Sequence, residues 1–294
     1  MTRFKKRDTR TAWLFITPYL IGYLMFHFAP IFLSFLMSLT NIRYISRLDN
    51  MKIVGIANYI EMFKDPEFIN ALSNSIKFTI MYVPLVMVFG LLMAVLINKP
   101  LYARNPIRGM LFMPYVSNMV AIAVVWSILL DPVSGVINMF LRSIGIHNPP
   151  MWLMGTKTAL VSVVIIAVWQ GVGLNFITYL AALQNVPTEQ KEAARIDGAN
   201  SWQTFWSVTI PSIAPATFLL LITSVINSLK NFTVVQVLTE GGPGTSTTIL
   251  PLNIVHTAFS SYRMGYASAQ TIVMFLIVMG ITIIQWTGKK RFED

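Results

Sequence analysis

The chain has 294 residues, of which 55% are hydrophobic and only 12% are charged. Ordinary soluble domains carry about 25% charged residues, so this chain lacks the polar surface that a soluble core of its size needs. The chain contains no cysteine, which excludes disulfides and thiol chemistry. The net charge is +10, and the basic residues cluster beside the apolar runs. This placement favours lipid headgroups over nucleic acid as the partner of these residues. We therefore expect an integral membrane protein.

The first apolar run, residues 12–39, follows a basic start made of Arg3, Lys5, Lys6, Arg7 and Arg10. This order is typical of a secretory signal, but the run is longer than the roughly 7–15 apolar residues of such a signal. It also lacks a closing small-x-small cleavage site, so we expect a retained membrane span. In the loop that follows, apolar residues alternate with charges from Ile56 to Ile69. That pattern predicts an interfacial helix broken at Pro66.

Five further apolar runs each reach the length of about 20 residues that a helix needs to cross hydrocarbon. They lie near residues 73–97, 107–130, 158–184, 212–235 and 267–287. The sequence therefore predicts an all-α integral membrane protein with six transmembrane helices, in a single domain over residues 1–294. Several runs contain prolines, namely Pro18, Pro30, Pro84 and Pro114. Kinks at these positions suit helices that line a cavity, and they equally suit simple packing bends.

The positions of lysine and arginine predict the orientation of the spans. With the N-terminus in the cytoplasm, 13 of the 22 cations lie inside and 9 lie outside. The inside cations are Arg3, Lys5, Lys6, Arg7, Arg10, Lys99, Arg104, Arg108, Lys191, Arg195, Lys289, Lys290 and Arg291. The outside cations are Arg43, Arg47, Lys52, Lys64, Lys77, Arg142, Lys157, Lys230 and Arg263. This bias predicts that both termini and the loop at residues 187–211 are cytoplasmic.

The 187–211 loop is polar and helix-forming, and it joins two of the predicted spans. Thr188 suits an N-cap with Glu189 in the first turn, and Gly198 permits a turn without a Cβ clash. Ser201 suits the cap of a second short helix, whose aromatic residues are Trp202, Phe205 and Trp206. Two interpretations stay open on composition: a docking element for a partner protein, and an amphipathic connector at the membrane surface.

The spacing within this loop resembles a known motif. Glu192-Ala193-Ala194, then Gly198 after three residues, then Val208-Thr209-Ile210-Pro211 after nine more, resembles the EAA loop of binding-protein-dependent ABC importer permeases. That family usually has isoleucine and leucine where this chain has Val208 and Ile210, which are conservative departures. The resemblance implies a type I ABC importer permease fold. It also implies that the residues contacting an ATPase subunit are Glu192, Ala193, Ala194, Asp197 and Gly198.

Further segments resemble the carbohydrate branch of that family. They are Phe15-Ile16-Thr17-Pro18, Asn58-Tyr59, Phe112-Met113-Pro114, Ala181-Ala182-Leu183-Gln184 with Pro187, Gly241-Gly242-Pro243-Gly244, and Gly265-Tyr266-Ala267-Ser268-Ala269. The Gly-Gly-Pro-Gly segment resembles the MalF-type subunit of the MalFG family more than its MalG-like partner. With only six spans, the chain lacks the large extra outside domain of the maltose protein. Contacts made by that domain therefore cannot be carried over.

The resemblance implies a transport function and a set of partners. The chain would be a permease subunit in a bacterial plasma (inner) membrane, working with a MalG-like second permease and two ABC ATPase subunits. An extracellular solute-binding protein would deliver a sugar or oligosaccharide. ATP and Mg would be held by the ATPase subunits, with no cofactor or metal on this chain and no enzymatic activity of its own. A permease for a glycerol-phosphate-like or other polar solute is the alternative.

The sugar site is expected on the fourth and fifth spans, where amides, hydroxyls and aromatic rings occur. By resemblance to the maltose protein, the positions expected to contact sugar are Gly171, Ser224, Asn227 and Asn231. Interhelical hydrogen bonding uses the same residue types and is the competing interpretation.

Three other membrane functions fit the sequence less well. An ion-coupled transporter needs carboxylates near mid-membrane, and no Asp or Glu falls at the centre of a predicted span. A membrane enzyme needs a catalytic pair or a zinc motif, and a nucleotide site needs a Gly-rich phosphate loop, neither of which is evident. A simple channel would leave the 187–211 loop unexplained. His27 stands alone within its span and is interpreted as a packed or bundle-facing histidine, not as a ligand or proton relay.

Overall fold

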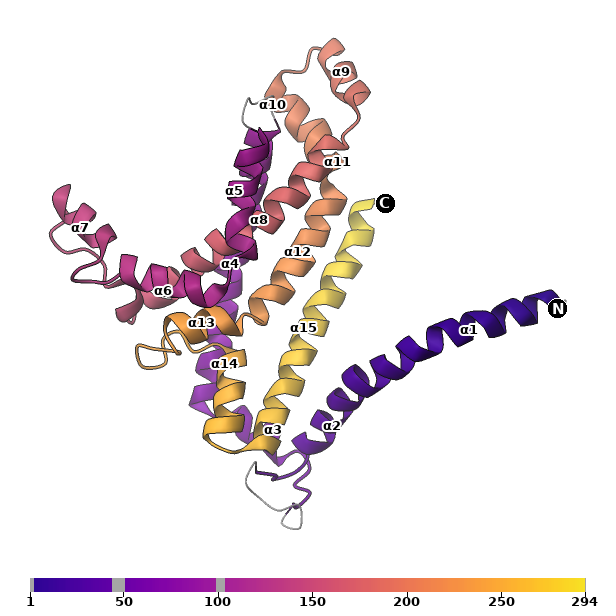
Figure 1. The fold of residues 1–294 in the computed structure, drawn as a ribbon, viewed down its shortest axis with the longest axis vertical. Coiled ribbons are helices and arrows are strands. Elements are labelled where there is room, and N and C mark those ends of the chain that lie inside the picture. Colours follow the sequence, from indigo (N-terminus) through magenta and orange to yellow (C-terminus); the bar gives the residue numbers. More distant parts are fainter. Residues whose placement is uncertain (1–2, 44–50, 99–103, 294) are drawn as a thin grey trace. The chain divides into compact units, whose positions relative to one another are not determined.

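The protein was analysed as a computed structural model, which describes residues 3–43, 51–98 and 104–293. The described residues form helices joined by loops, and the strand-like pairing among them is the isolated bridge between Thr40 and Ile53 (Figure 1). The expected all-α membrane fold is confirmed. Arg47 and Lys99, two cations used in the orientation argument, lie outside the described residues.

Two compact units can be distinguished by their internal contacts. The first comprises Met1–Asp65 and Ile254–Ile277, and the second comprises Pro66–Asn253 and Val278–Asp294. The expectation of a single permease domain over residues 1–294 stays a prediction.

The first unit contains the N-terminal helices and a short surface helix. Its elements are α1 (Arg3–Tyr23), the π-helical turn η1 (Leu24–Phe28), α2 (Ala29–Ser38), α3 (Ala57–Met62), the π-helical turn η5 (His256–Ser260) and the start of α15 (Met264–Glu293). The π-helical turn η1 ends two residues before Pro30, which has no backbone N–H to continue the α-helical pattern. The predicted break at Pro66 is confirmed, because α3 ends before it and α4 begins there. Phe68 and Ile69 therefore belong to α4 rather than to the interfacial helix.

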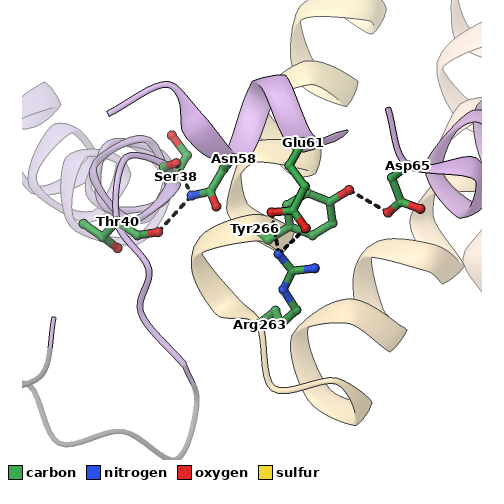
Figure 2. A network of polar contacts seen from close by, with 7 residues as sticks. All are labelled: Ser38, Thr40, Asn58, Glu61, Asp65, Arg263 and Tyr266. Atoms are coloured by element: carbon green, nitrogen blue, oxygen red, sulfur yellow. Dashed lines mark hydrogen bonds and ion pairs between the residues drawn. The ribbon is translucent and has the colours of Figure 1, made fainter. Parts of the chain in front are cut away.

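A network of polar contacts joins the parts of the first unit (Figure 2). The Asn58 amide donates to the backbone oxygens of Ser38 and Thr40, both at 2.8 Å. The Arg263 guanidinium reaches both Glu61 carboxylate oxygens at 2.7 Å and lies 4.2 Å from the centre of the Tyr266 ring. The Tyr266 hydroxyl donates to Asp65 at 2.6 Å. These bonds fasten α3 to the end of α2 and to the beginning of α15.

The second unit contains most of the apolar helices. Its elements are α4 (Pro66–Ile97), α5 (Arg104–Val116), α6 (Met119–Leu129), α7 (Val136–Ser143), the 3₁₀ turn η3 (Trp152–Met154), α8 (Ala159–Gln184), α9 (Thr188–Ile196), α10 (Ser201–Thr204), the π-helical turn η4 (Phe205–Thr209), α11 (Ile210–Ser212), α12 (Ala214–Leu229), α13 (Phe232–Leu238) and α14 (Leu250–Val255), which begins in this unit. α8 packs mainly against α4, and also against α5 and α12. In Figure 1, α9 and α10 lie at the end of α8 and α12 that is away from α13.

Among the residues that the structure describes, four helices are long and apolar enough to cross a membrane: Thr11–Ser38, Pro66–Ile97, Ala159–Gln184 and Met264–Gly288. The other two predicted spans are bent helix pairs, Asn105–Val116 with Met119–Leu129 at 96° and Ser201–Ser212 with Ala214–Leu229 at 64°. Six spans are thus obtained when each bent pair counts as one. The predicted span at 107–130 is thus a bent pair. Its second helix begins after Asn118, which has an extended backbone and whose side chain accepts from the Val120 N–H.

The fifth span also differs from its predicted boundaries of 212–235. It starts earlier, since the Ser201–Ser212 segment continues into α12 through the 64° bend. It ends at Leu229, because Asn231 leaves the helical conformation (ψ 72°) before α13 begins at Phe232. The part of the 187–211 loop that is separate from the span is therefore residues 187–200.

Candidate functional site

The polar loop begins where α8 ends. Pro187 adopts an extended conformation (φ −57°, ψ 130°) and occupies the N-cap position of α9. Thr188 is therefore the first helical residue and not the N-cap, and no side chain caps this end. Glu189 in the first turn and Arg195 in the last turn both have the sign of charge that the helix dipole favours.

Gly198 ends α9 in a complete Schellman motif. Its φ is +86°, in the left-handed region. The Gly198 N–H donates to the Arg195 oxygen at 3.0 Å, and the Ala199 N–H donates to the Ala194 oxygen at 2.9 Å. The turn predicted at Gly198 is confirmed, and its cause is backbone conformation. A Cβ added there would meet no heavy atom within 4 Å beyond its chain neighbours.

The second short helix begins with a capping box. The Asn200 side chain accepts from the Gln203 N–H, and the Gln203 side chain accepts from the Asn200 N–H, both at 2.9 Å. Asn200, rather than the predicted Ser201, is therefore the N-cap of α10. The short connection between α9 and α10 is thus held by local bonds at both of its ends.

The two faces of α9 differ in exposure. Glu189, Glu192, Ala193, Arg195 and Ile196 are exposed, whereas Lys191 and Ala194 are partly buried. Ile196 is 86% exposed, the largest fraction among the exposed large apolar residues of the described chain. A side chain of this kind on a polar helix indicates a contact surface, because burying it would release most of its apolar area from water. Ile196 was not among the residues predicted from the sequence.

The other end of the loop is anchored in the helix core. Val208 and Ile210, which belong to the EAA-like motif, pack against a buried cluster formed by residues of α4, α8 and α12 and by nearby residues. That cluster consists of Ala94, Ile97, Phe176, Tyr179, Leu180, Leu183, Val186, Ile213 and Leu220. The motif therefore divides into an exposed part on α9 and a partly buried part that connects the loop to two spans.

The residues expected to bind sugar lie in different environments. Ser224 is buried, and its helical neighbour Ser228 donates to Thr79 of α4 at 2.9 Å, so this side of α12 faces α4. Asn227 is exposed and Asn231 is partly exposed, just beyond the end of α12. Asn227 and Asn231 thus both have solvent-accessible surface, whereas Ser224 has almost none.

Gly171 is close to a neighbouring helix. A Cβ added to Gly171 of α8 would meet the Tyr82 hydroxyl of α4. The absence of a side chain at Gly171 thus lets α8 and α4 approach closely. The nearby Asn175 is buried, and its Oδ1 has no hydrogen-bond partner. Within the described ranges, no group of three His, Asp or Glu side chains is arranged to hold a metal ion.

Comparisons with known proteins agree with this architecture. Residues 68–287 match the family described as "Binding-protein-dependent transport system inner membrane component". The chain is 35% identical to the lactose transport system permease protein LacF of Rhizobium radiobacter, covering 95% of this chain and 94% of the relative. It is 32% identical to AmyD of Thermoanaerobacterium thermosulfurigenes, a probable starch degradation products transport system permease protein, covering 96% and 95%.

A solved structure shows the same fold. It is a bacterial ABC transporter involved in the import of alginate, and its matching chain superposes with a TM-score of 0.85 at 22% identity, with all of both chains covered. At this identity the match supports the fold alone. Because the family match extends over most of the chain, this protein is a member of the binding-protein-dependent transport system inner membrane component family.

Proposed function

We propose that this chain is the MalF-type permease subunit of an ATP-driven importer for a sugar or oligosaccharide. The observation that carries the proposal is the exposed face of α9, held between two spans of a chain that belongs to this permease family. Such a face would be the docking surface of an ATPase subunit. Both termini and the α9 loop would then lie in the cytoplasm.

The geometry supports a mechanical role for the loop. The Gly198 motif and the Asn200 capping box fix the connection between α9 and α10, and Ile210 anchors the following segment in the core. A displacement of α9 by the ATPase would therefore be transmitted to α8 and α12 instead of being lost in a flexible loop. Closure of the ATPase pair on ATP would switch the cavity between inward-facing and outward-facing forms. This chain would contribute no catalytic residue to ATP hydrolysis.

Sugar is the solute class that the relatives favour, since their names refer to lactose and to starch degradation products. An extracellular binding protein would deliver it, and a second, MalG-like permease would complete the pathway. Asn227 and Asn231 are the best candidates on this chain for hydrogen bonds to sugar hydroxyls, because both have accessible surface. Ser224 and Gly171 are better explained by packing.

One observation favours the alternative of a glycerol-phosphate-like solute. Lys230 is exposed and lies between Asn227 and Asn231 in the chain, so a cation stands beside the two amides. A phosphate would be attracted to that charge, whereas a neutral sugar would not need it. Replacement of Lys230 by Gln distinguishes the two. Uptake of a sugar should persist in that variant, and uptake of a phosphorylated solute should fall.

The direct test is reconstitution of the complete complex in lipid vesicles. The expected result is ATP hydrolysis and uptake that both rise when the sugar-loaded binding protein is added on the outside. The proposal would be contradicted if the rate of ATP hydrolysis did not change on addition of the binding protein loaded with any solute of a panel of carbohydrates and glycerol phosphates.

Orientation can be tested separately because the chain has no native cysteine. A cysteine placed at Ala193 should react with a membrane-impermeant thiol reagent only from the cytoplasmic side. A cysteine at Ser143, at the end of α7, should react only from the outside. The reverse labelling pattern would overturn the assignment of the loop.

A further inference from the structure

A cavity of about 310 Å³ is bordered by α9, whose Lys191 and Arg195 contribute to its lining. It is formed by the last turns of α4 and α8, by α9, and by α10 with η4. Its lining residues are Val95, Asn98, Leu183, Lys191, Arg195, Ser201, Thr204, Phe205 and Thr209. The volume is far above the ~15 Å³ that one water needs and falls at the lower end of the ~300–1,000 Å³ range of ligand pockets.

The charges that line this cavity have one sign. Lys191 and Arg195 are four residues apart and therefore share one side of α9, and no Asp or Glu is among the lining residues. Across the described part of the chain, the ion pair that forms is Glu61 with Arg263, so both cations of the cavity are left without a carboxylate. The acids of α9, Glu189 and Glu192, do not line the cavity. Of the two cations, Lys191 is partly buried and Arg195 is exposed.

A simpler explanation for the two cations is that they neutralise the C-terminal ends of α4 and α8. The structure shows no hydrogen bond from Lys191 or Arg195 to a carbonyl oxygen of any described residue, although such a bond is the usual form of this interaction. Ser201, Thr204 and Thr209 also line the cavity, and the Thr204 hydroxyl already donates to the Asn200 backbone oxygen at 3.0 Å. Two cations and the hydroxyls of Ser201 and Thr209, without an acid, form a set of donors that suits an anion with several oxygens.

Aromatic side chains border this set. Trp202 is 69% exposed and Trp206 is 52% exposed. Phe205, which lines the cavity, lies 6.3 Å from Trp202 and 5.5 Å from Trp206 between ring centroids. Exposed tryptophans at the end of a membrane span are typical of the headgroup level of a bilayer, where one side of the ring is apolar and its N–H is in water. The cavity would thus lie at the depth of lipid phosphates.

We infer that this cavity binds a phosphate-bearing anion, held by Lys191 and Arg195, with the headgroup of an anionic phospholipid as the expected source and free phosphate as the other. The inference rests on the proposed function, since that places α9 at the cytoplasmic membrane surface. Basic pockets at this surface are known to suit anionic headgroups. The bound anion would hold α9 to α4 and α8 while its exposed face stays available to the ATPase.

The inference can be tested by native mass spectrometry of the assembled complex in a non-ionic detergent. The probes are short-chain phosphatidylglycerol, short-chain phosphatidylcholine and inorganic phosphate. The test variant is Lys191→Gln with Arg195→Gln, and the matched control is Lys52→Gln with Lys64→Gln, which removes the same charge from other described positions. At about 1 kcal/mol for each cation near an anionic surface, the test variant should bind phosphatidylglycerol roughly 30-fold more weakly. The control variant should bind it as the unmodified complex does.

The other probes identify the source of the anion. If phosphatidylcholine binds more weakly than phosphatidylglycerol, the source of the anion is an anionic lipid. If inorganic phosphate binds as tightly as phosphatidylglycerol, the site is assigned to free phosphate. Equal phosphatidylglycerol binding by the unmodified complex and the test variant would overturn the inference. If the test variant does not assemble, the charge-conserving exchange Lys191→Arg with Arg195→Lys should keep the binding, and its loss would likewise overturn the inference. Lipid binding is measured without transport, so failure of the proposed importer function would be seen separately as hydrolysis that does not respond to sugar.

Discussion

Replacing Gly198 by alanine should uncouple ATP hydrolysis from transport while leaving the complex assembled. The φ of +86° costs an L-residue about 1–2 kcal/mol, and no steric clash adds to this because the space around a Cβ is open. If α9 relieves the strain by leaving its native orientation, the population of the correctly oriented loop falls by about 5–30-fold. Gly198→Asn should have a smaller effect, because asparagine tolerates the left-handed region.

The chain contains a matched control for this experiment. Gly145 ends α7 with φ +94°, and no heavy atom lies within 4 Å of an added Cβ there either. It forms the same pair of bonds, from the Gly145 N–H to Arg142 at 3.1 Å and from the Ile146 N–H to Leu141 at 3.0 Å. Gly145→Ala therefore has a similar strain in a loop that we do not assign to the ATPase.

The assay is the number of sugar molecules taken up for each ATP hydrolysed by the reconstituted complex. This ratio should fall in Gly198→Ala and stay unchanged in Gly145→Ala. Equal ratios in both variants and in the unmodified complex would refute the assignment of α9 as the transmitting element.

Three further substitutions test individual contacts. Ile196→Glu should reduce the ATPase retained by an affinity-tagged permease at least tenfold, because a buried isoleucine contributes about 1.5–3 kcal/mol; full retention would show that Ile196 does not contact the ATPase. Gly171→Ala should lower the free energy of unfolding of the complex by about 1–3 kcal/mol, because the new Cβ would clash with Tyr82. Tyr82→Phe in the same chain should restore part of this loss. If it restores none, the contact between Gly171 and Tyr82 is contradicted. Gly265→Ala should also be destabilising by about 1–3 kcal/mol, since its Cβ would meet the Thr40 backbone, while Gly280→Ala, where the space is open, should be close to neutral. Equal melting temperatures for these last two variants would contradict the packing described for the first unit.

Hydropathy predicted the spans well because it measures the property that decides membrane insertion. The predicted run 158–184 differs from Ala159–Gln184 by a single residue at its start. α4 starts earlier than predicted, since its first turns carry polar residues such as Glu67 and Asn70 and extend the helix past the apolar run. The bend at Asn118 was missed because one polar residue hardly changes a window average. The capping chemistry of Asn before an apolar stretch is the local signal that could have identified it.

The candidate site could be predicted only where the residue type by itself indicates the backbone conformation. Gly198 was found because glycine is the usual residue at a left-handed position. Ile196 was missed since its exposure depends on which side of α9 faces the bundle, a consequence of tertiary packing. The same limit applies to Gly171, whose neighbour Tyr82 comes from a different helix. It applies also to Lys191 and Arg195, which in the sequence serve only as cations that indicate the orientation of the spans.

The helix Thr11–Ser38 has no buried residue in its most apolar stretch. Its transfer from water into hydrocarbon therefore owes nothing to side-chain packing within its own chain, and its insertion energy is a property of the segment alone. A chimera that carries an unrelated apolar helix in place of this stretch, and that keeps Ser38 with its contact to Asn58, should fold its remaining spans with the same melting temperature. In this protein, the free energy of inserting the first span into the membrane is therefore separate from the free energy of packing the remaining spans.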